Sequence, residues 1–189
     1  MEIARSKAAL FLSQRKYVLD LLKETGMLKS KPTDTPMDAA QKFGLCSDTD
    51  PVDKERYQRL AGKLIYLSHT RPDIALSVSV VSQFINAPRE GHLNAVFRIL
   101  RYLKLTPGKG ILYQKHEDTG VKVYCDVYWA GSVVDKRSTT GYCTYVWGNL
   151  VTWRSKKQHV VSRSSIEAEF RALALGICEG LWLKKLLSD

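Results

Sequence analysis

The chain has 189 residues, of which 44% are hydrophobic and 25% are charged, a composition typical of a globular protein with a real core. Its formal net charge of +10 favours anionic partners, of which nucleic acid is the commonest. The sequence contains no stretch of about 18 uncharged apolar residues, so we expect no transmembrane helix and no membrane partner.

The first residues do not resemble a secretory signal peptide. Glu2 follows the first methionine at once, and the apolar run at 8–12 is shorter than the roughly 7–15 residues of a signal's hydrophobic segment. The cysteines show neither C-x-x-C pairing nor the spacing of metal ligands. We therefore expect an intracellular protein of the cytoplasm or nucleus, with reduced thiols.

The N-terminal part predicts a hairpin followed by a helix. Residues 2–13 alternate loosely, which is compatible with a hairpin. Residues 14–24 place their apolar side chains on one helical face, with Ser13 as N-cap and Gly26 as the stop signal. Residues 30–53 are rich in Pro, Asp, Thr and Ser without periodicity, and they predict a linker or surface loop.

Helical spacing of apolar residues continues after this loop. The breaks are Arg71-Pro72-Asp73 and Ala87-Pro88, and Thr106-Pro107-Gly108 ends the pattern. We expect the helices between these breaks to cover each other's apolar stripes and to form a compact unit. The predicted helices span residues 54–70, 74–86 and 90–104.

The second half changes to the alternation of strands. Between residues 121 and 129 the odd-numbered side chains form one apolar face, and the even-numbered ones, including Asp126, form the other. Shorter apolar runs predict further strands, with Gly148-Asn149 as a strong hairpin signal. These runs lie at 110–114, 142–147 and 150–153.

A long helix is predicted after the strands, over 166–187. Ser164-Ser165 is interpreted as its cap rather than as a nucleophile. The expected fold class is thus α+β, with a helical unit followed by three antiparallel strands and one helix that packs across them. The apolar stripe that marks this helix consists of Ile166, Phe170, Leu173, Ile177 and Leu181.

A few carboxylates are candidates for chemistry. Hydrolysis of a phosphodiester with two metal ions needs converging carboxylates, because hard cations take oxygen ligands. Asp126 lies in mid-strand, and Glu167 or Glu169 lies in the first turns of the following helix. Both glutamates flank the apolar stripe, so geometry does not choose between them. Alternatively, the helix dipole alone favours a glutamate there, and the strand face that carries Asp126 is simply wetted.

A basic run follows Trp153, with Arg154, Lys156 and Lys157 in close succession. These residues would contact the phosphates of an RNA–DNA hybrid while the tryptophan stacks on a sugar. The alternative is the solvated end of a hairpin beside a core tryptophan. The histidines share no spacing, so we expect neither a metal-binding nor a catalytic role for them.

At this point the residues resemble a known family. YCDVYWAGS, with KRSTTGYCTYVWGNLVTWRSKKQHVVSRSSIEAEFRALA, resembles the RNase H domain of copia-type retrotransposon Pol polyproteins. Segments such as YQRLAGKLIYLSHTRPDIALSVSVVSQF resemble the end of the reverse transcriptase and the connection that follows it. The resemblance covers essentially the whole chain. It implies a reverse-transcriptase remnant at 1–38, a linker at 39–53, a helical connection at 54–108 and a truncated RNase H-like domain at 109–189.

The resemblance also implies roles for individual residues. Asp126 corresponds to the first metal-binding aspartate, and Glu169 to the glutamate of the family's E-x-x-A element, with Mg²⁺ as the ion if the site is functional. Tyr128 stands where the family usually has a second acid. The third aspartate of such sites comes from a strand after this helix, whereas the sequence ends at Asp189. We therefore expect a vestigial site.

The function implied is that of a retrotransposon-derived fragment of reverse transcriptase and RNase H. We expect it to be catalytically inactive, to keep affinity for nucleic acid such as an RNA–DNA hybrid, and to associate through an exposed sheet edge. No adjacent Asp–Asp pair occurs in the chain, so no polymerase activity is expected. A still active Mg²⁺-dependent ribonuclease H is an alternative.

A different class of function is suggested by Arg98-Ile99-Leu100-Arg101, which spells R-x-L-R and resembles the translocation motif of secreted oomycete effectors. On this interpretation the protein is secreted into a host plant cell and acts by binding host proteins. The alternative is structural, because Leu100 lies on the apolar stripe of the helix predicted at 90–104, with Arg98 and Arg101 on its solvated face.

Overall fold

The computed structural model describes residues 1–38, 44, 49–117 and 119–188, so much of the linker predicted at 39–53 lies outside the described residues. The expected mixture of helices and antiparallel sheets is confirmed. The chain forms two compact units, the first from residues 1–5 and 11–111 and the second from 6–10 and 112–189. Within the described part of the chain, no helix is long and apolar enough to cross a membrane.

The first unit is mainly helical, and its buried face agrees with the predicted stripes. Each of the apolar residues expected on α2 is buried, namely Tyr57, Leu60, Ala61, Leu64 and Leu67. They form one hydrophobic core with residues of α1, α3 and α4. The described elements up to β3 are β1 (Glu2–Arg5), β2 (Ala9–Ser13), α1 (Arg15–Glu24), η1 (Met27–Lys29), α2 (Lys54–Ser68), η3 (Pro72–Ile74), α3 (Ala75–Ser82), α4 (Glu90–Leu105) and β3 (Gly110–Gln114). Residues 9–10 of β2 and 112–114 of β3 belong to the second unit.

Two boundary predictions in this part are wrong. The N-cap of α1 is Gln14 rather than Ser13, because the Ser13 hydroxyl donates instead to a carboxylate oxygen of Glu2 at 3.2 Å. The third predicted helix, α3, ends at Ser82 rather than at residue 86. The hairpin predicted at 2–13 is confirmed as β1 and β2, which are neighbours in the sheet β1–β2–β3.

A buried ion pair joins the break after α2 to the end of α4. The Arg71 side chain is 1% exposed, and its Nε and Nη2 donate to the two Asp73 carboxylate oxygens at 2.9 and 2.8 Å. The same guanidinium donates to the Thr106 carbonyl at 2.8 Å, and the Tyr102 hydroxyl donates to Asp73 at 2.8 Å. Such a bidentate pair is both strong and geometrically specific.

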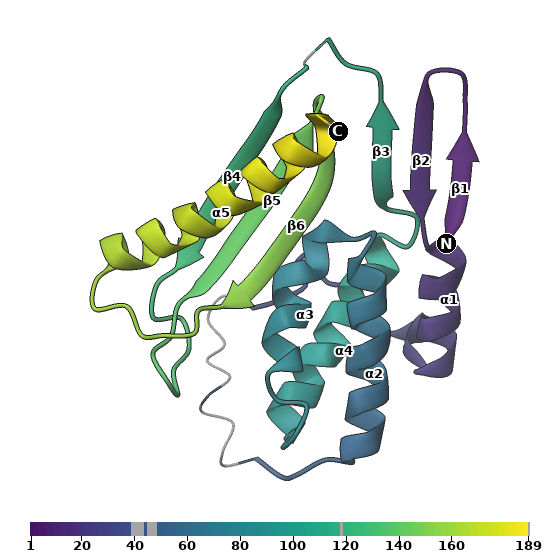
Figure 1. The fold of residues 1–189 in the computed structure, drawn as a ribbon. Coiled ribbons are helices and arrows are strands. Elements are labelled where there is room, and N and C mark those ends of the chain that lie inside the picture. Colours follow the sequence, from purple (N-terminus) through teal and green to yellow (C-terminus); the bar gives the residue numbers. More distant parts are fainter. Residues whose placement is uncertain (39–43, 45–48, 118, 189) are drawn as a thin grey trace. The chain divides into compact units, whose positions relative to one another are not determined.

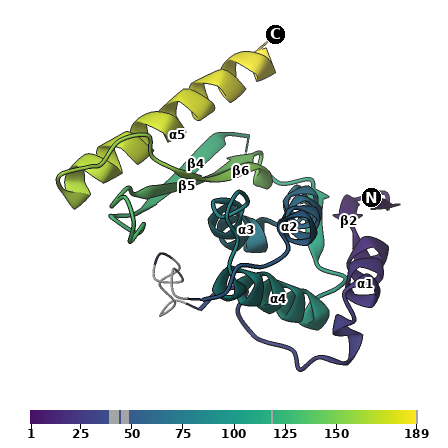
Figure 2. The same cartoon turned by 90° about the horizontal axis from the view of Figure 1, so that it is seen from below.

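The second unit consists of an antiparallel sheet with one helix across it (Figures 1 and 2). The hairpin between its last two strands lies one residue earlier than predicted, because the positive φ angles fall on Trp147 (50°) and Gly148 (74°). Both angles suit a two-residue hairpin turn, and Asn149 already belongs to the next strand. The elements are β4 (Val121–Tyr128), β5 (Thr139–Val146), β6 (Asn149–Lys157) and α5 (Ser165–Ser188).

The predicted apolar stripe of α5 does not face the sheet, which corrects the sequence-based expectation. Small residues cover the sheet instead, because a Cβ on Gly176 would lie 2.1 Å from the Cys125 sulfur and one on Gly180 would lie 2.9 Å from a Val123 methyl. At this approach large side chains would not fit between helix and sheet. The buried residues of α5 are Ala168, Ala172, Gly176 and Leu183.

The Arg71–Asp73 pair should dominate the acid sensitivity of the first unit. Burial is the largest influence on Asp73 and opposes its ionisation, but hydrogen bonds and charges from Arg71, Tyr102 and Lys109 outweigh it and lower the pKa of Asp73. A lowered folded-state pKa contributes stability above the unfolded value of about 3.9, and this stability is lost as the pH falls through the folded pKa.

Asp73→Asn should therefore lower the free energy of unfolding at pH 7 by roughly 3–5 kcal/mol, because it leaves a buried guanidinium unpaired. It should also flatten the loss of stability between about pH 4 and the lower folded pKa. Urea unfolding across this pH range measures both effects. Lys109→Gln is the control, because Lys109 contacts the same carboxylate at 3.4 Å but is 52% exposed. An equal loss in both variants would contradict the prediction.

Gly176→Ala tests the close approach of α5 to β4. The added methyl would overlap the Cys125 sulfur, and overpacking of this kind costs about 1–3 kcal/mol. Gly62→Ala in α2 is the matched control, because a Cβ there meets nothing within 4 Å and should instead stabilise the helix by up to about 1 kcal/mol. Chemical denaturation should give opposite signs for the two variants.

Candidate functional site

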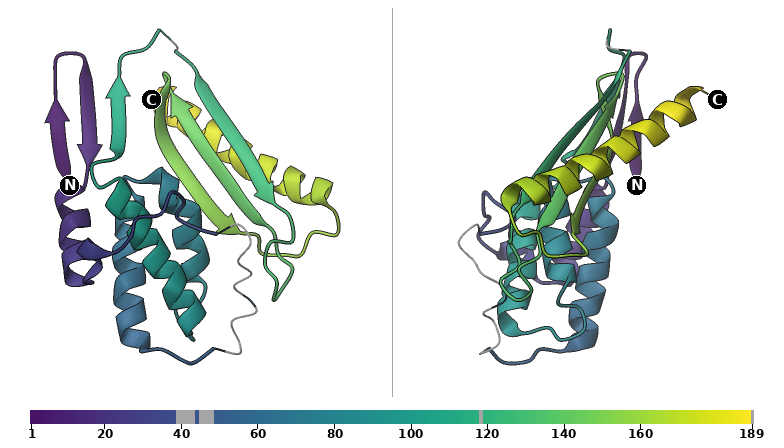
Figure 3. Two further views of the ribbon diagram at one scale, coloured as in Figure 1. Left: turned by 180° about the vertical axis from the view of Figure 1, so that it is seen from behind. Right: turned by 60° about the vertical axis from the view of Figure 1, so that its left-hand side comes forward.

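The sheet β4–β5–β6 has two distinct faces. The side chains of Val123 and Cys125 point toward α5, so their neighbours along β4 point to the other side. We call this other side the open face; it is turned toward the viewer in the left panel of Figure 3, with α5 behind the sheet. On β4 the open face carries Lys122, Tyr124, Asp126 and Tyr128.

Aromatic side chains are the main feature of the open face. Tyr124 is 58% exposed and Tyr128 is 65% exposed. The Tyr124 ring meets the Tyr145 ring of β5 edge to face, with centroids 5.8 Å apart. Trp153 of β6 pairs with Cys143 and belongs to the same face. These rings form an apolar but wettable surface on a hydrogen-bonded antiparallel sheet, whose register shifts between Thr144 and Tyr145.

Asp126 lies on this open face, near the C-terminal end of β4. It is exposed and pairs across the strands with Gly141, which has no side chain to cover it. One carboxylate oxygen accepts a hydrogen bond from the backbone N–H of Val127 at 2.8 Å. The carboxylate is therefore available to solvent and cations on the side of the sheet that does not meet α5.

The two candidate glutamates of α5 have different environments. Glu167 takes part in the helix cap: its backbone N–H donates to the Ser164 hydroxyl at 3.1 Å, which confirms Ser164 as the cap, and its carboxylate accepts from the Arg163 N–H at 2.8 Å. This backbone bond, followed by the bond from Arg171, lowers the pKa of Glu167. Glu169 is exposed near the start of the same helix.

Asp126 and Glu169 do not converge in this arrangement. Asp126 points away from the face on which α5 lies, whereas Glu169 is carried by α5 itself. Oxygen ligands of Mg²⁺ lie at about 2.0–2.1 Å from the ion, so two carboxylates must come close together to share one. Among the residues described, no group of three or more His, Cys, Asp or Glu side chains is placed to hold a metal ion. The alternation of β4 therefore does not favour a Mg²⁺ ion shared by Asp126 and Glu169.

The predicted basic contact residues are divided between the two faces. Trp153 and Lys157 lie on the open face, whereas Arg154 and Lys156 are on the α5 face, opposite Tyr142 and Thr140. Lys157 donates to the Asp135 carboxylate at 3.2 Å, so part of its charge is compensated locally. A single nucleic-acid backbone cannot contact all four residues from one side of the sheet.

A buried amide that the sequence analysis did not single out positions the start of α5. The Gln158 Nε2 group donates to the Thr140 hydroxyl and to the Ala168 carbonyl, each at 3.0 Å. Its Oε1 accepts from the Ser162 hydroxyl at 3.0 Å. Gln158 therefore ties the end of β6 to β5 and to the first turns of α5, which sets where Glu167 and Glu169 lie. Its position inside a basic run gave no signal of burial.

The translocation-like motif is built into the core of the first unit. Ile99 is 1% exposed and Leu100 is fully buried. Arg98 donates to the Thr35 hydroxyl at 2.9 Å, and the Nε of Arg101 is buried. A receptor that recognised these four residues as a linear motif would have to unfold α4.

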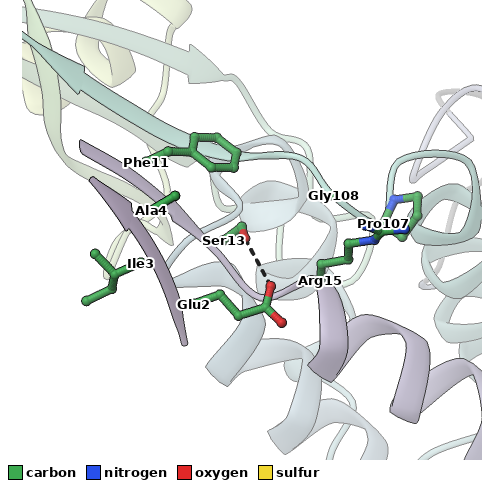
Figure 4. A pocket seen from close by; sticks show the side chains of 8 residues that line it. All are labelled: Glu2, Ile3, Ala4, Phe11, Ser13, Arg15, Pro107 and Gly108. Carbon is green, nitrogen blue, oxygen red and sulfur yellow. Dashed lines mark hydrogen bonds between the residues drawn. The ribbon is translucent and has the colours of Figure 1, made fainter. Parts of the chain in front are cut away.

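A hollow of about 530 Å³ lies in the first unit and is shown in Figure 4. Its one acid is already engaged: Glu2 accepts from the Ser13 hydroxyl and from the backbone N–H of Lys16 at 3.1 Å. The remaining surface is small, apolar or basic, so we assign no chemistry to it. The lining residues are Glu2, Ile3, Ala4, Phe11, Ser13, Arg15, Pro107 and Gly108.

Comparison with known proteins relates the sequence to retrotransposons. The chain is 44% identical over 189 residues to the retrovirus-related Pol polyprotein from transposon RE1 of Arabidopsis thaliana, an alignment that covers all of this chain and 13% of that polyprotein. It is 38% identical over 182 residues to an uncharacterized mitochondrial protein of the same plant, covering 96% of this chain and 75% of that protein.

A third relative has a different name. The chain is 41% identical over 128 residues to secreted RxLR effector protein 161 of Plasmopara viticola, covering 67% of this chain and 90% of that protein. No protein-family model matches the sequence. No solved structure matches it either.

Proposed function

The chain belongs to the copia-type retrotransposon Pol polyproteins, and from this premise we propose that it binds nucleic acid without cleaving it. In this proposal the sheet β4–β5–β6 with α5 is an RNase H-like part, and the first unit combines the end of the reverse transcriptase with the connection that follows it. Its place of action is inside the cell, where the intermediates of retrotransposition are made.

We infer the absence of cleavage from the side of the sheet to which the Asp126 side chain points. Cys125 points to α5, so Asp126 points to the opposite side of the sheet from the helix that bears Glu169. Two-metal hydrolysis requires carboxylates that clamp both ions around one phosphate. Tyr128, on the same face as Asp126, supplies a phenol in place of a further carboxylate. The site therefore offers one exposed acid rather than a cluster.

Binding is supported by charge and by the open face. The net charge of +10 attracts a polyanion over long range. Tyr124 and Tyr128 present exposed rings on which bases or sugars stack, a contact that tolerates any sequence. Because Arg154 and Lys156 lie on the other face, the phosphate contacts of a strand on the open face come from Lys122, Lys157 and the flanking loops.

The effector interpretation is a second candidate, favoured by the name of the Plasmopara viticola relative. Two observations weigh against it for this chain. The R-x-L-R residues are held in the core of the first unit, and the same relative aligns along a stretch for which the Pol polyproteins are also similar. A secreted, protein-binding role would need to use surfaces other than this motif.

The first experiment measures cleavage. Purified protein with Mg²⁺ and a labelled RNA–DNA hybrid should give no cleavage above a protein-free sample, and Asp126→Asn should behave in the same way. The reason is that the carboxylates do not converge on one ion. Mg²⁺-dependent cleavage that Asp126→Asn abolishes would refute the inactive state.

The second experiment measures binding to the same hybrid and to single strands. Tyr124→Ala should weaken binding by about 1–3 kcal/mol, or roughly 5-fold to 150-fold, because a base loses the ring on which it stacks. Trp182→Ala is a matched control, since Trp182 is 55% exposed but lies on α5 rather than on the open face. Equal losses in both variants, or no binding by the wild type at low salt, would contradict the proposed surface.

A further inference from the structure

The acid of the open face lies in the middle of an aromatic surface. Directly paired residues of neighbouring strands share a face of the sheet, so the pairing defines rows of side chains across it. Along β4, Tyr124 and Tyr128 lie on either side of Asp126, each about 7 Å away along the strand. The rows, in order along β4, are Tyr124–Cys143–Trp153, Asp126–Gly141–Ser155 and Tyr128–Thr139–Lys157.

The space beside the Asp126 carboxylate is open. Gly141 lies opposite it on β5, and a Cβ there would meet only the Asp126 carbonyl oxygen, at 3.9 Å. One carboxylate oxygen accepts the Val127 N–H at 2.8 Å, which orients the group. Lone pairs remain on both oxygens, so the carboxylate can still accept hydrogen bonds from a ligand.

The neighbouring rings are held in place and are still more than half exposed. The Tyr124 ring packs edge to face against Tyr145. The Tyr128 ring lies so close to Gly131 that a Cβ on that glycine would overlap it. Rings that are already fixed lose little conformational freedom when a flat ligand stacks on them. The open face is therefore suited to planar groups on both sides of one carboxylate.

The charges of the open face favour a single strand over a duplex. A duplex presents its phosphates outward and keeps its bases stacked on each other, so its backbone would meet the Asp126 carboxylate and leave the rings unused. In a single strand the unpaired bases can occupy the centre of the face while the phosphates lie at its border. Lys122 and Lys157 lie at opposite corners of this border, where the phosphates would pass.

A carboxylate also distinguishes between unpaired bases by their donors. The Watson–Crick edge of guanine carries two adjacent N–H groups, which match the two oxygens of one carboxylate, and such bidentate charge-assisted pairs are strong. In adenine and cytosine the amino group adjoins a ring nitrogen that is an acceptor, and in uracil and thymine carbonyl oxygens flank the one N–H group. Their lone pairs would face the carboxylate unfavourably. Guanine is therefore the base that Asp126 would select.

We propose that the open face binds single-stranded nucleic acid, with an unpaired guanine stacked on Tyr124 or Tyr128 and its Watson–Crick edge on Asp126. This rests on the proposed function, because it takes the open face as the nucleic-acid surface and adds the kind of strand and the base. Asp126 then reads a base instead of holding a metal ion. A free guanine nucleotide offers the same edge, but only a strand contacts several rings and both lysines at once.

The test is the binding of the full chain to labelled strands of about 12 nucleotides, each a run of thymidine with one variable base at its centre. The strand with guanine should bind at least about fivefold more tightly than strands with adenine, cytosine or thymine, and than the same strand paired with complementary RNA. Hypoxanthine, which lacks the amino donor of guanine, should give an intermediate affinity. Free guanosine monophosphate should displace the strand only at much higher concentration.

Variants connect this preference to the carboxylate. Asp126→Asn should remove most of the guanine preference, whereas the all-thymidine strand should bind as well or better, because a negative charge has left the surface. Asp20→Asn makes the same change in α1 of the first unit and should leave the preference intact. Gly141→Val keeps the acid but fills the space beside it, so it should also reduce the preference. Circular dichroism of each variant establishes that the fold is retained.

The possible failures are distinguishable. Equal affinity for all the single strands, a preference that survives Asp126→Asn, tighter binding of the hybrid than of the single strand, or displacement by equimolar guanosine monophosphate would overturn this inference. Each of these results would leave nucleic-acid binding itself in place. Absence of binding to every strand at low salt would refute the proposed function, and this inference with it.

Discussion

The close approach of α5 to β4 at Gly176 is the constraint from which the functional surfaces of the second unit follow. The Cys125 sulfur occupies the space that a side chain at position 176 would need, so only small residues can face the sheet there. This choice of face turns the large apolar residues of α5 outward. It also fixes the face to which each side chain of β4 points. Because Cys125 lies under the helix, Asp126 points to the other side of the sheet.

The two units differ in the kind of side chains that form their interiors. The first has a broad hydrophobic core, and the buried guanidinium of Arg71 is paired there with the Asp73 carboxylate. Between sheet and helix the second unit buries small and polar side chains, with Thr144 and Gln158 among them. A thin, hydrogen-bonded interior holds strands and helix in register, but it hides little apolar area. Many large apolar and aromatic side chains of this unit consequently lie on its surfaces, among them Tyr124, Tyr128 and Phe170.

Much of the fold could be predicted from periodicity. The stripes of α2 and α4 were recognisable because each covers a thick core with large residues, and the alternation of β4 was clear over its whole length. The errors have local physical causes. Ser13 bonds to Glu2 across the hairpin instead of capping α1, and the turn after β5 starts at Trp147 because a two-residue loop takes both positive φ angles before Asn149. The inner face of α5 gave no signal, since alanine and glycine contribute little to a hydrophobic pattern.

By itself the sequence determined the family of this protein, the order of its helices and strands, and the identity of the acids and bases with chemical potential, because these depend on local spacing and on similarity. Only the tertiary structure decided which of those residues act together. A strand alternates its side chains between two faces, and the packing of α5 determines which face is covered. Asp126 therefore points away from the helix that bears Glu169. For the same reason Trp153 and Lys157 lie on the opposite face from Arg154 and Lys156.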